Sequence, residues 1–246
     1  MKIAALDSSG LVASVAIMED ENLIAEYTIQ YKKTHSQTLL PMLDEITKMV
    51  ELDLSTIDAI AVAAGPGSFT GLRIGSATAK GLGFALQKPL IGVPTIEGLA
   101  YNMYGTDELV CPIMDARRGQ VYTGIFEFSE DAMKVGTENM PISYHLQTIV
   151  PQCAITMEEL IVKLNELQRK VIFVGDGIPV FAETMKTELK IPYHLAPAHR
   201  NRQSAASIAA LAQIYYEQGK IQSAEEHEPE YLRLSQAERE RIEKEK

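Results

Sequence analysis

The order of expected elements repeats once along this chain of 246 residues, and this repetition constrains the fold more than any single motif does. In the first half, apolar runs and helical spacing predict strands at 2–6, 11–18 and 22–29, a helix from Thr34, a strand at 58–64, a helix at 70–86, a strand at 90–93 and a helix at 95–103. The second half shows strands at 109–115 and 120–128, no clear pattern up to about residue 155, a helix at 156–167, a strand at 171–174, a helix at 178–188, a strand at 191–195 and a helix at 202–217. A meander followed by alternating helices and strands favours two α/β lobes, each built on a mixed sheet.

The pattern is interrupted at Tyr104-Gly105-Thr106-Asp107, which predicts the join between the lobes. We therefore expect a first lobe at 1–104, a second lobe at 105–223 and a charged tail at 224–246. The tail should be solvated or frayed, because its charges alternate in sign and it has no apolar face. Thr34 and Gln37 are spaced as a capping box for the first helix, and Pro41 predicts a kink near its start.

Composition excludes several classes of protein. The formal net charge is −10 and the basic residues are scattered along the chain, which disfavours unaided binding to nucleic acid. No apolar stretch approaches the roughly 20 residues that span a membrane, and the amino terminus is too polar for a secretory signal. Cys111 and Cys153 form no CxxC motif and no disulfide framework, which suits a reducing cytoplasm.

The glycine-rich segment from Gly65 to Gly75, GPGSFTGLRIG, lies between an expected strand and helix, where backbone N–H groups favour anions. It lacks the Lys-Ser/Thr pair that a P-loop has after its last glycine, because Leu72-Arg73 follows Gly71. Its GxGxxxG spacing also departs from the GxGxxG of dinucleotide-binding folds. Ser68 directly follows a glycine, so the GxSxG elbow of hydrolases is absent.

Metal and carboxylate sites have weaker signals. The five histidines form neither HxxxH nor HExxH pairs, so no metal site is expected. Asp7, Asp115 and Asp176 each follow an expected strand, where α/β folds place their chemistry. These aspartates indicate either a cleft between the lobes or three side chains that close turns.

The helix at 70–86 has two distinct faces. Leu72, Gly75, Ala79, Leu82 and Leu86 form a face on which glycine allows another backbone to approach closely; this face packs either on the chain's own sheet or on a partner.

The opposite face of that helix predicts a partner surface, because an outward phenylalanine stands among basic residues. Two methionines at the edge of the preceding helix's apolar stripe extend this prediction, although methionine also commonly fills cores. The predicted interface residues are Met42, Met49, Arg73, Ala77, Lys80 and Phe84.

Four segments together carry a family resemblance: AGPGSFTGLRIG, the amino-terminal ALDSS, HSQTLLP and VGDG. With these motifs, over nearly the whole chain, the sequence resembles the TsaB (YeaZ) family of tRNA threonylcarbamoyladenosine biosynthesis proteins. The resemblance implies the sugar kinase, Hsp70 and actin fold, a ribonuclease H-like architecture with duplicated mixed-sheet lobes. It also implies a non-catalytic subunit that dimerises with a catalytic TsaD-like protein through helices of the first lobe and assembles with a TsaE-like ATPase.

The resemblance carries further expectations about ligands and partners. Active members of that fold bind nucleotide with a DxGT-type loop, whereas this chain reads Asp7-Ser8-Ser9-Gly10, and its second-lobe counterpart is Gly175-Asp176-Gly177. We therefore expect no catalytic residues and no cofactor of its own, with at most weak or shared ATP or ADP binding in a complex. tRNA would be contacted only through the complex, and the isolated protein would form a homodimer. The alternative is an independently active nucleotide-dependent kinase or transferase of the same fold.

Overall fold

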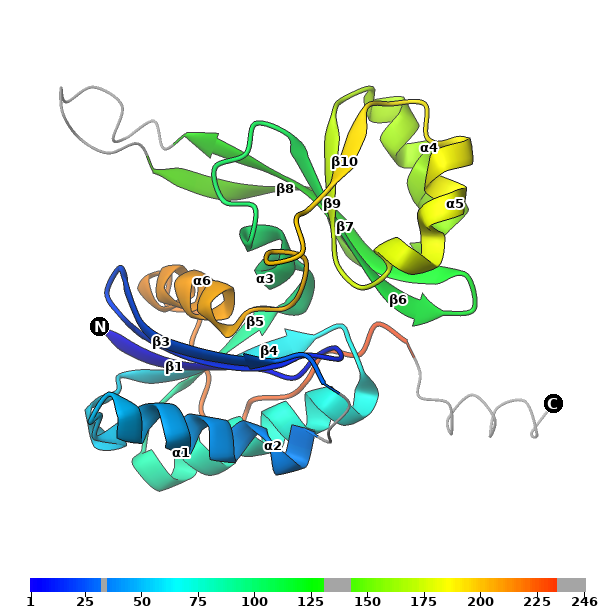
Figure 1. Ribbon diagram of the computed structural model, residues 1–246. Coiled ribbons are helices and arrows are strands. Elements are labelled where there is room, and N and C mark those ends of the chain that lie inside the picture. Colours follow the sequence, from blue (N-terminus) through cyan, green and yellow to red (C-terminus); the bar gives the residue numbers. More distant parts are fainter. Residues whose placement is uncertain (32–34, 131–142, 234–246) are drawn as a thin grey trace, which may run out of the picture. The chain divides into compact units, whose positions relative to one another are not determined.

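Two five-stranded sheets form the framework of the protein (Figure 1). The computed structural model describes residues 1–31, 35–130 and 143–233. The first sheet has the order β3-β2-β1-β4-β5, and the second, read from its opposite edge, has the order β8-β7-β6-β9-β10. In each sheet the first three strands along the chain pair with one another in antiparallel fashion. The remaining two strands run parallel to the central strand, which is β1 in the first sheet and β6 in the second. The expected pair of mixed-sheet α/β lobes is therefore confirmed.

The first compact unit comprises residues 1–95 and 204–246. Its elements are β1 (Lys2–Asp7), β2 (Ala13–Glu19), β3 (Asn22–Ile29), the short helices η1 (His35–Gln37) and η2 (Leu54–Thr56), α1 (Leu39–Met49), β4 (Ala59–Gly65), α2 (Phe69–Leu86), β5 (Leu90–Pro94) and α6 (Ala205–Glu217). Helices α1 and α2 cover one face of the sheet, and α6 crosses the other face and contacts all five strands (Figure 1). The sheet is therefore covered by helices on both faces, which explains the nearly continuous burial of β1 and β4.

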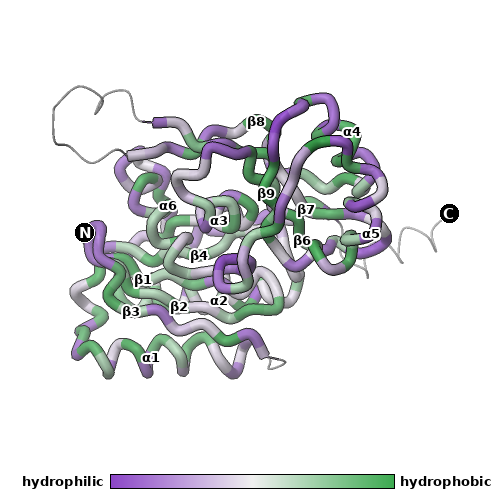
Figure 2. The backbone as a smooth tube through the Cα atoms, turned by 45° about the horizontal axis from the view of Figure 1, so that its top comes forward, coloured by the Kyte–Doolittle hydropathy of each residue, from purple (hydrophilic) through white to green (hydrophobic). Residues whose placement is uncertain are grey.

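The second unit comprises residues 96–203. Its elements are α3 (Thr95–Tyr101), β6 (Leu109–Arg117), β7 (Gln120–Glu130), β8 (Tyr144–Thr156), α4 (Met157–Leu167), β9 (Val171–Val174), α5 (Ile178–Glu188) and β10 (Tyr193–Leu195). Helices α4 and α5 share one hydrophobic cluster with Phe173, and α3 shares another with Phe126. Figure 2 shows hydrophobic residues concentrated along the strands, whereas α1 alternates between hydrophobic and hydrophilic positions.

The observed division of the chain differs from the expected boundaries at 104 and 223. Helix α3 follows the first sheet in sequence but belongs to the second unit, and α6 follows the second sheet but belongs to the first. The buried side chains of α6 include Ile208 and Leu211, and this apolar face packs on the first sheet. A helical apolar stripe shows that the helix must be covered, but not which of two sheets covers it.

Two local expectations also change. Helix α1 begins at Leu39 with no side-chain cap from Thr38, and Pro41 lies in its first turn, where a missing N–H is tolerated. Thr34 lies outside the described residues. The segment without a clear pattern before residue 155 contains β8, an edge strand paired with β7, on which Pro151 is tolerated.

The tail expected to be solvated from Ala224 onwards is instead packed against the first unit as far as the structure describes it. Ala224 and His227 are buried, and the N–H of Glu230 donates to the carbonyl oxygen of Ala64. Residues 234–246 of the expected tail lie outside the described residues. None of the helices within the described ranges combines the length and apolar composition needed to cross a membrane.

Candidate functional site

The glycine-rich segment Gly65–Gly75 connects β4 to α2 and lies against the loop that follows β1. Ser68 is the N-cap of α2, and its Oγ accepts a hydrogen bond from the N–H of Gly71 at 3.3 Å. The N–H of Ser68 donates to the carbonyl oxygen of Ser9 at 2.7 Å. Ser8 completes the contact, because its Oγ donates to the carbonyl oxygen of Gly71 at 2.9 Å. The two loops are therefore held together by one backbone–backbone hydrogen bond and one hydrogen bond from the Ser8 side chain.

This contact explains why glycine is required at two positions of the segment. A Cβ atom on Gly67 would overlap the carbonyl oxygen of Ser9, and one on Gly71 would overlap the carbonyl oxygen of Ser8. One turn further along α2, a Cβ on Gly75 would lie only 2.6 Å from Ser8 Oγ. The sequence expectation of an unusually close backbone approach to this helix is confirmed, and the approaching backbone is the chain's own.

Gly65 meets a different part of the chain. Its φ of +119° is one that side-chain-bearing residues rarely adopt, and a Cβ there would overlap the carbonyl oxygen of Glu230. Glycines at positions 65, 67 and 71 thus all face carbonyl oxygens of this chain. Carbonyl oxygens repel anions, so these three sides of the segment are unsuited to a phosphate.

Asp7, at the end of β1, is almost completely buried. Its Oδ1 accepts hydrogen bonds from the N–H of Ser9 at 2.8 Å and the Oγ of Ser9 at 2.7 Å, which closes the turn after the strand. Burial raises the pKa of this carboxyl group to about 6, although the two bonds from Ser9 and the nearby His35 oppose the rise. His35 is held by a 2.9 Å bond between its Nε2 and the carbonyl oxygen of Gly10.

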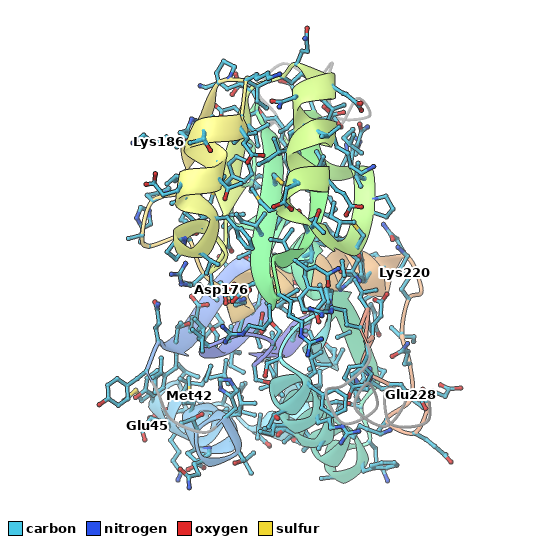
Figure 3. All side chains as sticks on the ribbon, turned by 90° about the vertical axis from the view of Figure 1, so that its right-hand side faces the viewer. Met42, Glu45, Asp176, Lys186, Lys220 and Glu228 are labelled. Atoms are coloured by element: carbon cyan, nitrogen blue, oxygen red, sulfur yellow. The ribbon has the colours of Figure 1, made fainter. Side chains whose placement is uncertain are left out.

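Asp115 and Asp176 lie together in the second unit. The N–H of Asp115 donates to Asp176 Oδ1 at 3.2 Å, and burial raises the pKa of Asp176. The carboxylate of Asp115 accepts bonds from the backbone N–H of Arg117 at 2.8 Å and its Nη1 at 3.0 Å. Figure 3 labels Asp176 on the loop that precedes α5, where Arg202 Nη1 donates to the carbonyl oxygen of neighbouring Gly175 at 3.3 Å.

The three strand-end aspartates are therefore divided between the two units: Asp115 and Asp176 are adjacent, and Asp7 belongs to the other unit. Each accepts hydrogen bonds from backbone N–H groups of a turn or strand end, as in the turn-closing interpretation. Among the residues that the structure describes, no three His, Cys, Asp or Glu side chains gather closely enough to hold a metal ion.

The six predicted interface residues separate into distinct environments. Met49 at the end of α1 is 73% exposed and Phe84 on α2 is 62% exposed, while Arg73 and Ala77 are also exposed. Arg73 stacks its guanidinium over the ring of Phe69 at 4.1 Å.

Met42 does not fit the prediction of an exposed contact. It is only 3% exposed and belongs to the core between α1 and the first sheet, because it lies on the buried face of α1 with Leu39 and Ile46. Figure 3 labels Met42 and Glu45 on this helix. Leu40, 53% exposed in the first turn of α1, is an outward apolar residue that the sequence pattern did not single out.

Lys80 is the second interface residue with a different environment. Its Nζ donates to the carbonyl oxygens of Glu225 at 3.2 Å and of His227 at 2.9 Å. The ammonium group therefore binds the C-terminal segment of the same unit. The sequence offered no signal for this contact, because the acceptors are backbone carbonyls.

Comparison with known proteins places this architecture in a family. The family model described as "TsaD: tRNA N6-adenosine threonylcarbamoyltransferase" matches residues 22–241. The tRNA threonylcarbamoyladenosine biosynthesis protein TsaB of Bacillus subtilis (strain 168) is 31% identical, with 100% of both chains covered. The protein of the same name from Escherichia coli (strain K12) is 29% identical, with 95% of both chains covered.

A solved structure gives the same result. The structure of YeaZ from Pseudomonas aeruginosa is 27% identical, has a TM-score of 0.73, and is matched over 94% of this chain and 100% of that one. The strand order shared by the two sheets and this match show that the chain has the same duplicated α/β architecture as that structure. The chain belongs to the TsaB (YeaZ) family of tRNA threonylcarbamoyladenosine biosynthesis proteins.

Proposed function

We propose that this protein is a non-catalytic subunit in the biosynthesis of tRNA N6-threonylcarbamoyladenosine, and that it binds a TsaD-like catalytic protein through the outer faces of α1 and α2. The observation that carries this proposal is the environment of the glycine-rich segment. On the side where a side chain would project, Gly65, Gly67 and Gly71 face the carbonyl oxygens of Glu230, Ser9 and Ser8. The glycines allow the close packing that positions α2, and the exposed surface of this helix is then the part that binds the partner.

The outer faces of α1 and α2 suit a protein partner. These helices lie side by side on one face of the first sheet, so side chains that point away from the sheet share a surface (Figure 1). Leu40, Met49 and Phe84 are large apolar side chains that are more than half exposed on these two helices. Burial of a large exposed aromatic side chain at the centre of an interface commonly contributes 2 kcal/mol or more, on the order of a hot spot.

The charge of the chain supports an indirect role with tRNA. With a net charge of −10, this subunit would weaken binding to phosphates, so the catalytic partner would supply the positive surface. We propose that a TsaE-like ATPase joins this pair, and that ATP or ADP is bound only weakly or at a shared contact. When alone, the apolar surface of α1 and α2 would pair with a second copy of itself as a homodimer.

One observation favours the alternative, an independently active nucleotide-dependent kinase or transferase. The buried Asp7 has a pKa near 6, which is a suitable value for a general base near neutral pH. Against this, both hydrogen bonds to Asp7 Oδ1 come from Ser9 and close a turn. We therefore propose a structural role for this carboxyl group.

The test is a binding measurement between this protein and the TsaD-like protein of the same organism, with charged substitutions on each unit. Phe84→Asp should weaken binding by about 30-fold or more, which corresponds to roughly 2 kcal/mol. Val162 on α4 of the second unit is 57% exposed, so Val162→Asp is a matched control that should leave the affinity unchanged. Equal affinities for all three proteins would refute the proposed surface.

Calorimetry with ATP and Mg²⁺ on the isolated protein separates the two functions. The proposal predicts no micromolar binding and no ATP turnover by the chain alone. Turnover that disappears in Asp7→Asn, with the fold retained, would establish the enzyme alternative instead.

A further inference from the structure

Residues 221–233, which we call the C-terminal strap, cross the first unit from its edge strand to its centre. At one end, Leu90 of β5 and Gln222 exchange two backbone hydrogen bonds, of 2.8 and 2.9 Å. At the other end, the N–H of Glu230 donates to the carbonyl oxygen of Ala64 in β4 at 2.7 Å. The ring of Tyr231 packs on Phe69 at the start of α2, with the centroids 4.8 Å apart. The strap is therefore attached at both ends by specific contacts.

The middle of the strap is anchored by His227, which is only 1% exposed. Its ring packs against β5, where a Cβ on Gly92 would lie 3.4 Å from the ring carbon Cε1. Its backbone oxygen accepts the 2.9 Å bond from Lys80 Nζ. The ring therefore lies within van der Waals distance of the β5 backbone at residue 92.

The contacts of His227 indicate which ring nitrogen carries the proton when the ring is neutral. Nδ1 lies 2.9 Å from Gln222 Oε1, and because an amide oxygen only accepts, Nδ1 carries the proton and donates. In the neutral ring, Nε2 is then the unprotonated nitrogen. It is buried and has no hydrogen-bond partner among the described residues.

The charges around His227 oppose a second proton. From α2 the facing group is the ammonium of Lys80, whereas β4 and β5 contribute Ala64, Gly92 and Leu90 at the strap. On the strap itself, the carboxylate of Glu226 accepts a bond from the N–H of Ser223, and Glu225 and Glu228 are exposed. Figure 3 labels Glu228 at the surface of this segment. No carboxylate among the described residues is bonded to the ring.

We propose that the strap is a pH-sensitive closure, docked on β4, β5 and α2 while His227 is neutral and released when the ring is protonated. A proton on Nε2 would be buried without an acceptor and next to an ammonium group, whereas in the released strap water would solvate the imidazolium. Burial and the charge of Lys80 accordingly lower the pKa of His227.

The direction of the pH dependence follows from this. A histidine whose pKa is lower in the docked state favours docking fully above its free pKa of about 6.5, and loses that stabilisation as the pH falls. The docking equilibrium should weaken by about tenfold per pH unit below about pH 6.5, until the pKa of the docked ring is reached. Release would uncover the edge of β5 and free Lys80 and Phe69 on α2. This inference concerns the free chain and does not depend on the proposed function.

The experiment is amide hydrogen exchange, followed by NMR on the full chain between about pH 7.5 and about pH 5.5, a range that brackets the free histidine pKa. Protection factors, which remove the intrinsic pH dependence of exchange, are compared for the N–H groups of Gln222 and Glu230 and for those of β1 as an internal reference. We expect the strap amides to lose about tenfold in protection from about pH 6.5 to about pH 5.5 while β1 is unchanged.

Two variants test the role of the ring. His227→Gln cannot be protonated, so its strap amides should show protection that is independent of pH. His199→Gln, at an exposed histidine of the second unit, should keep the decline of the natural chain. Strap protection that does not change with pH in the natural chain, or an unchanged decline in His227→Gln, overturns the proposal.

A direct titration covers the case in which His227→Gln does not dock. The NMR signal of the His227 ring in the natural chain should titrate with a midpoint below about pH 6.5, because docking favours the neutral ring. A midpoint at or above that value would refute the switch even if the variant were uninformative.

Discussion

The N–H of Glu230 donates to the carbonyl oxygen of Ala64 at 2.7 Å, so a residue near the end of the described chain closes over the carboxyl end of β4. This contact places the carbonyl oxygen of Glu230 where a side chain on Gly65 would begin. The glycine that opens the glycine-rich segment is thus required by the C-terminal strap. Two segments that are distant in sequence constrain each other through one backbone hydrogen bond.

Replacement of Gly65 by alanine should destabilise the protein by about 3 kcal/mol or more. The φ of +119° strains any side-chain-bearing residue, and the added methyl group overlaps Glu230. Gly119 provides the control, because it also has a positive φ, +73°, but has no atom within 4 Å of an added Cβ. Gly119→Ala should cost only about 1 kcal/mol in urea unfolding. Similar costs for the two variants would contradict the assigned contact.

Two glycines on α2 should respond to alanine with opposite signs. An added methyl group on Gly81 meets nothing within 4 Å, so Gly81→Ala should increase the free energy of unfolding by up to about 1 kcal/mol through helix propensity. On Gly71 the methyl group overlaps the carbonyl oxygen of Ser8, so Gly71→Ala should decrease it by about 2 kcal/mol or more. Denaturant titrations of both variants check this. A stabilising effect of Gly71→Ala would show that the two loops do not pack as described.

Asp7→Asn should flatten part of the pH dependence of stability. The pKa of Asp7 is raised to about 6 from 3.8, so the folded state disfavours the carboxylate, and its stability falls as the pH rises from 3.8 to 6. The difference of roughly two pKa units corresponds to about 3 kcal/mol of stability lost at neutral pH. Asparagine is neutral and keeps an oxygen that can accept both bonds from Ser9.

The corresponding measurement is the free energy of unfolding of Asp7→Asn and of the natural chain between pH 4 and pH 8. The variant should become more stable than the natural chain as the pH rises, with the gap largest above about pH 6. If the difference in free energy of unfolding between the two proteins instead grew as the pH fell, folding would favour the carboxylate form of Asp7.

The two methionines of α1 should behave oppositely in stability and binding. Met42 is in the core, so Met42→Ala should cost about 2–5 kcal/mol of stability, whereas Met49→Ala should change it by less than about 0.5 kcal/mol. In a binding assay with the TsaD-like protein, Met49→Ala should weaken the affinity several-fold with no loss of fold. Circular dichroism melts and titration calorimetry of both variants separate these effects. An equal loss of stability in the two variants would place both methionines in the core.

Much of the local structure could be predicted because it depends on periodic burial. The helix expected at 70–86 is α2 at 69–86, with Leu72, Gly75 and Ala79 buried and Phe84 exposed. The order of most helices and strands along the chain also followed from their length and alternation. Asp115 and Asp176 lie at the carboxyl ends of the adjacent parallel strands β6 and β9 and are joined by a hydrogen bond. This agrees with the expectation that both residues stand at strand ends.

Other features had no local signal. Helix α6 has an apolar face that either sheet could have covered, and only the folded chain assigns it to the first sheet. Strand β8 escaped notice because an edge strand exposes part of its length to water and so lacks the continuous apolar run of a central strand. The position of Met42 at the border of the apolar stripe predicts an interface, because the stripe does not show how far the sheet extends over α1.

The sequence by itself determined two α/β lobes, the limits of most helices and strands and the family to which the chain is similar, because hydrophobic period and glycine placement act over a few neighbouring residues. Only the tertiary structure decided which carbonyl oxygens face Gly65, Gly67 and Gly71, and that the strap covers β5 with His227 buried against it. These contacts are made largely by backbone groups, which every residue carries, so their partners cannot be recognised until the chain has brought them together.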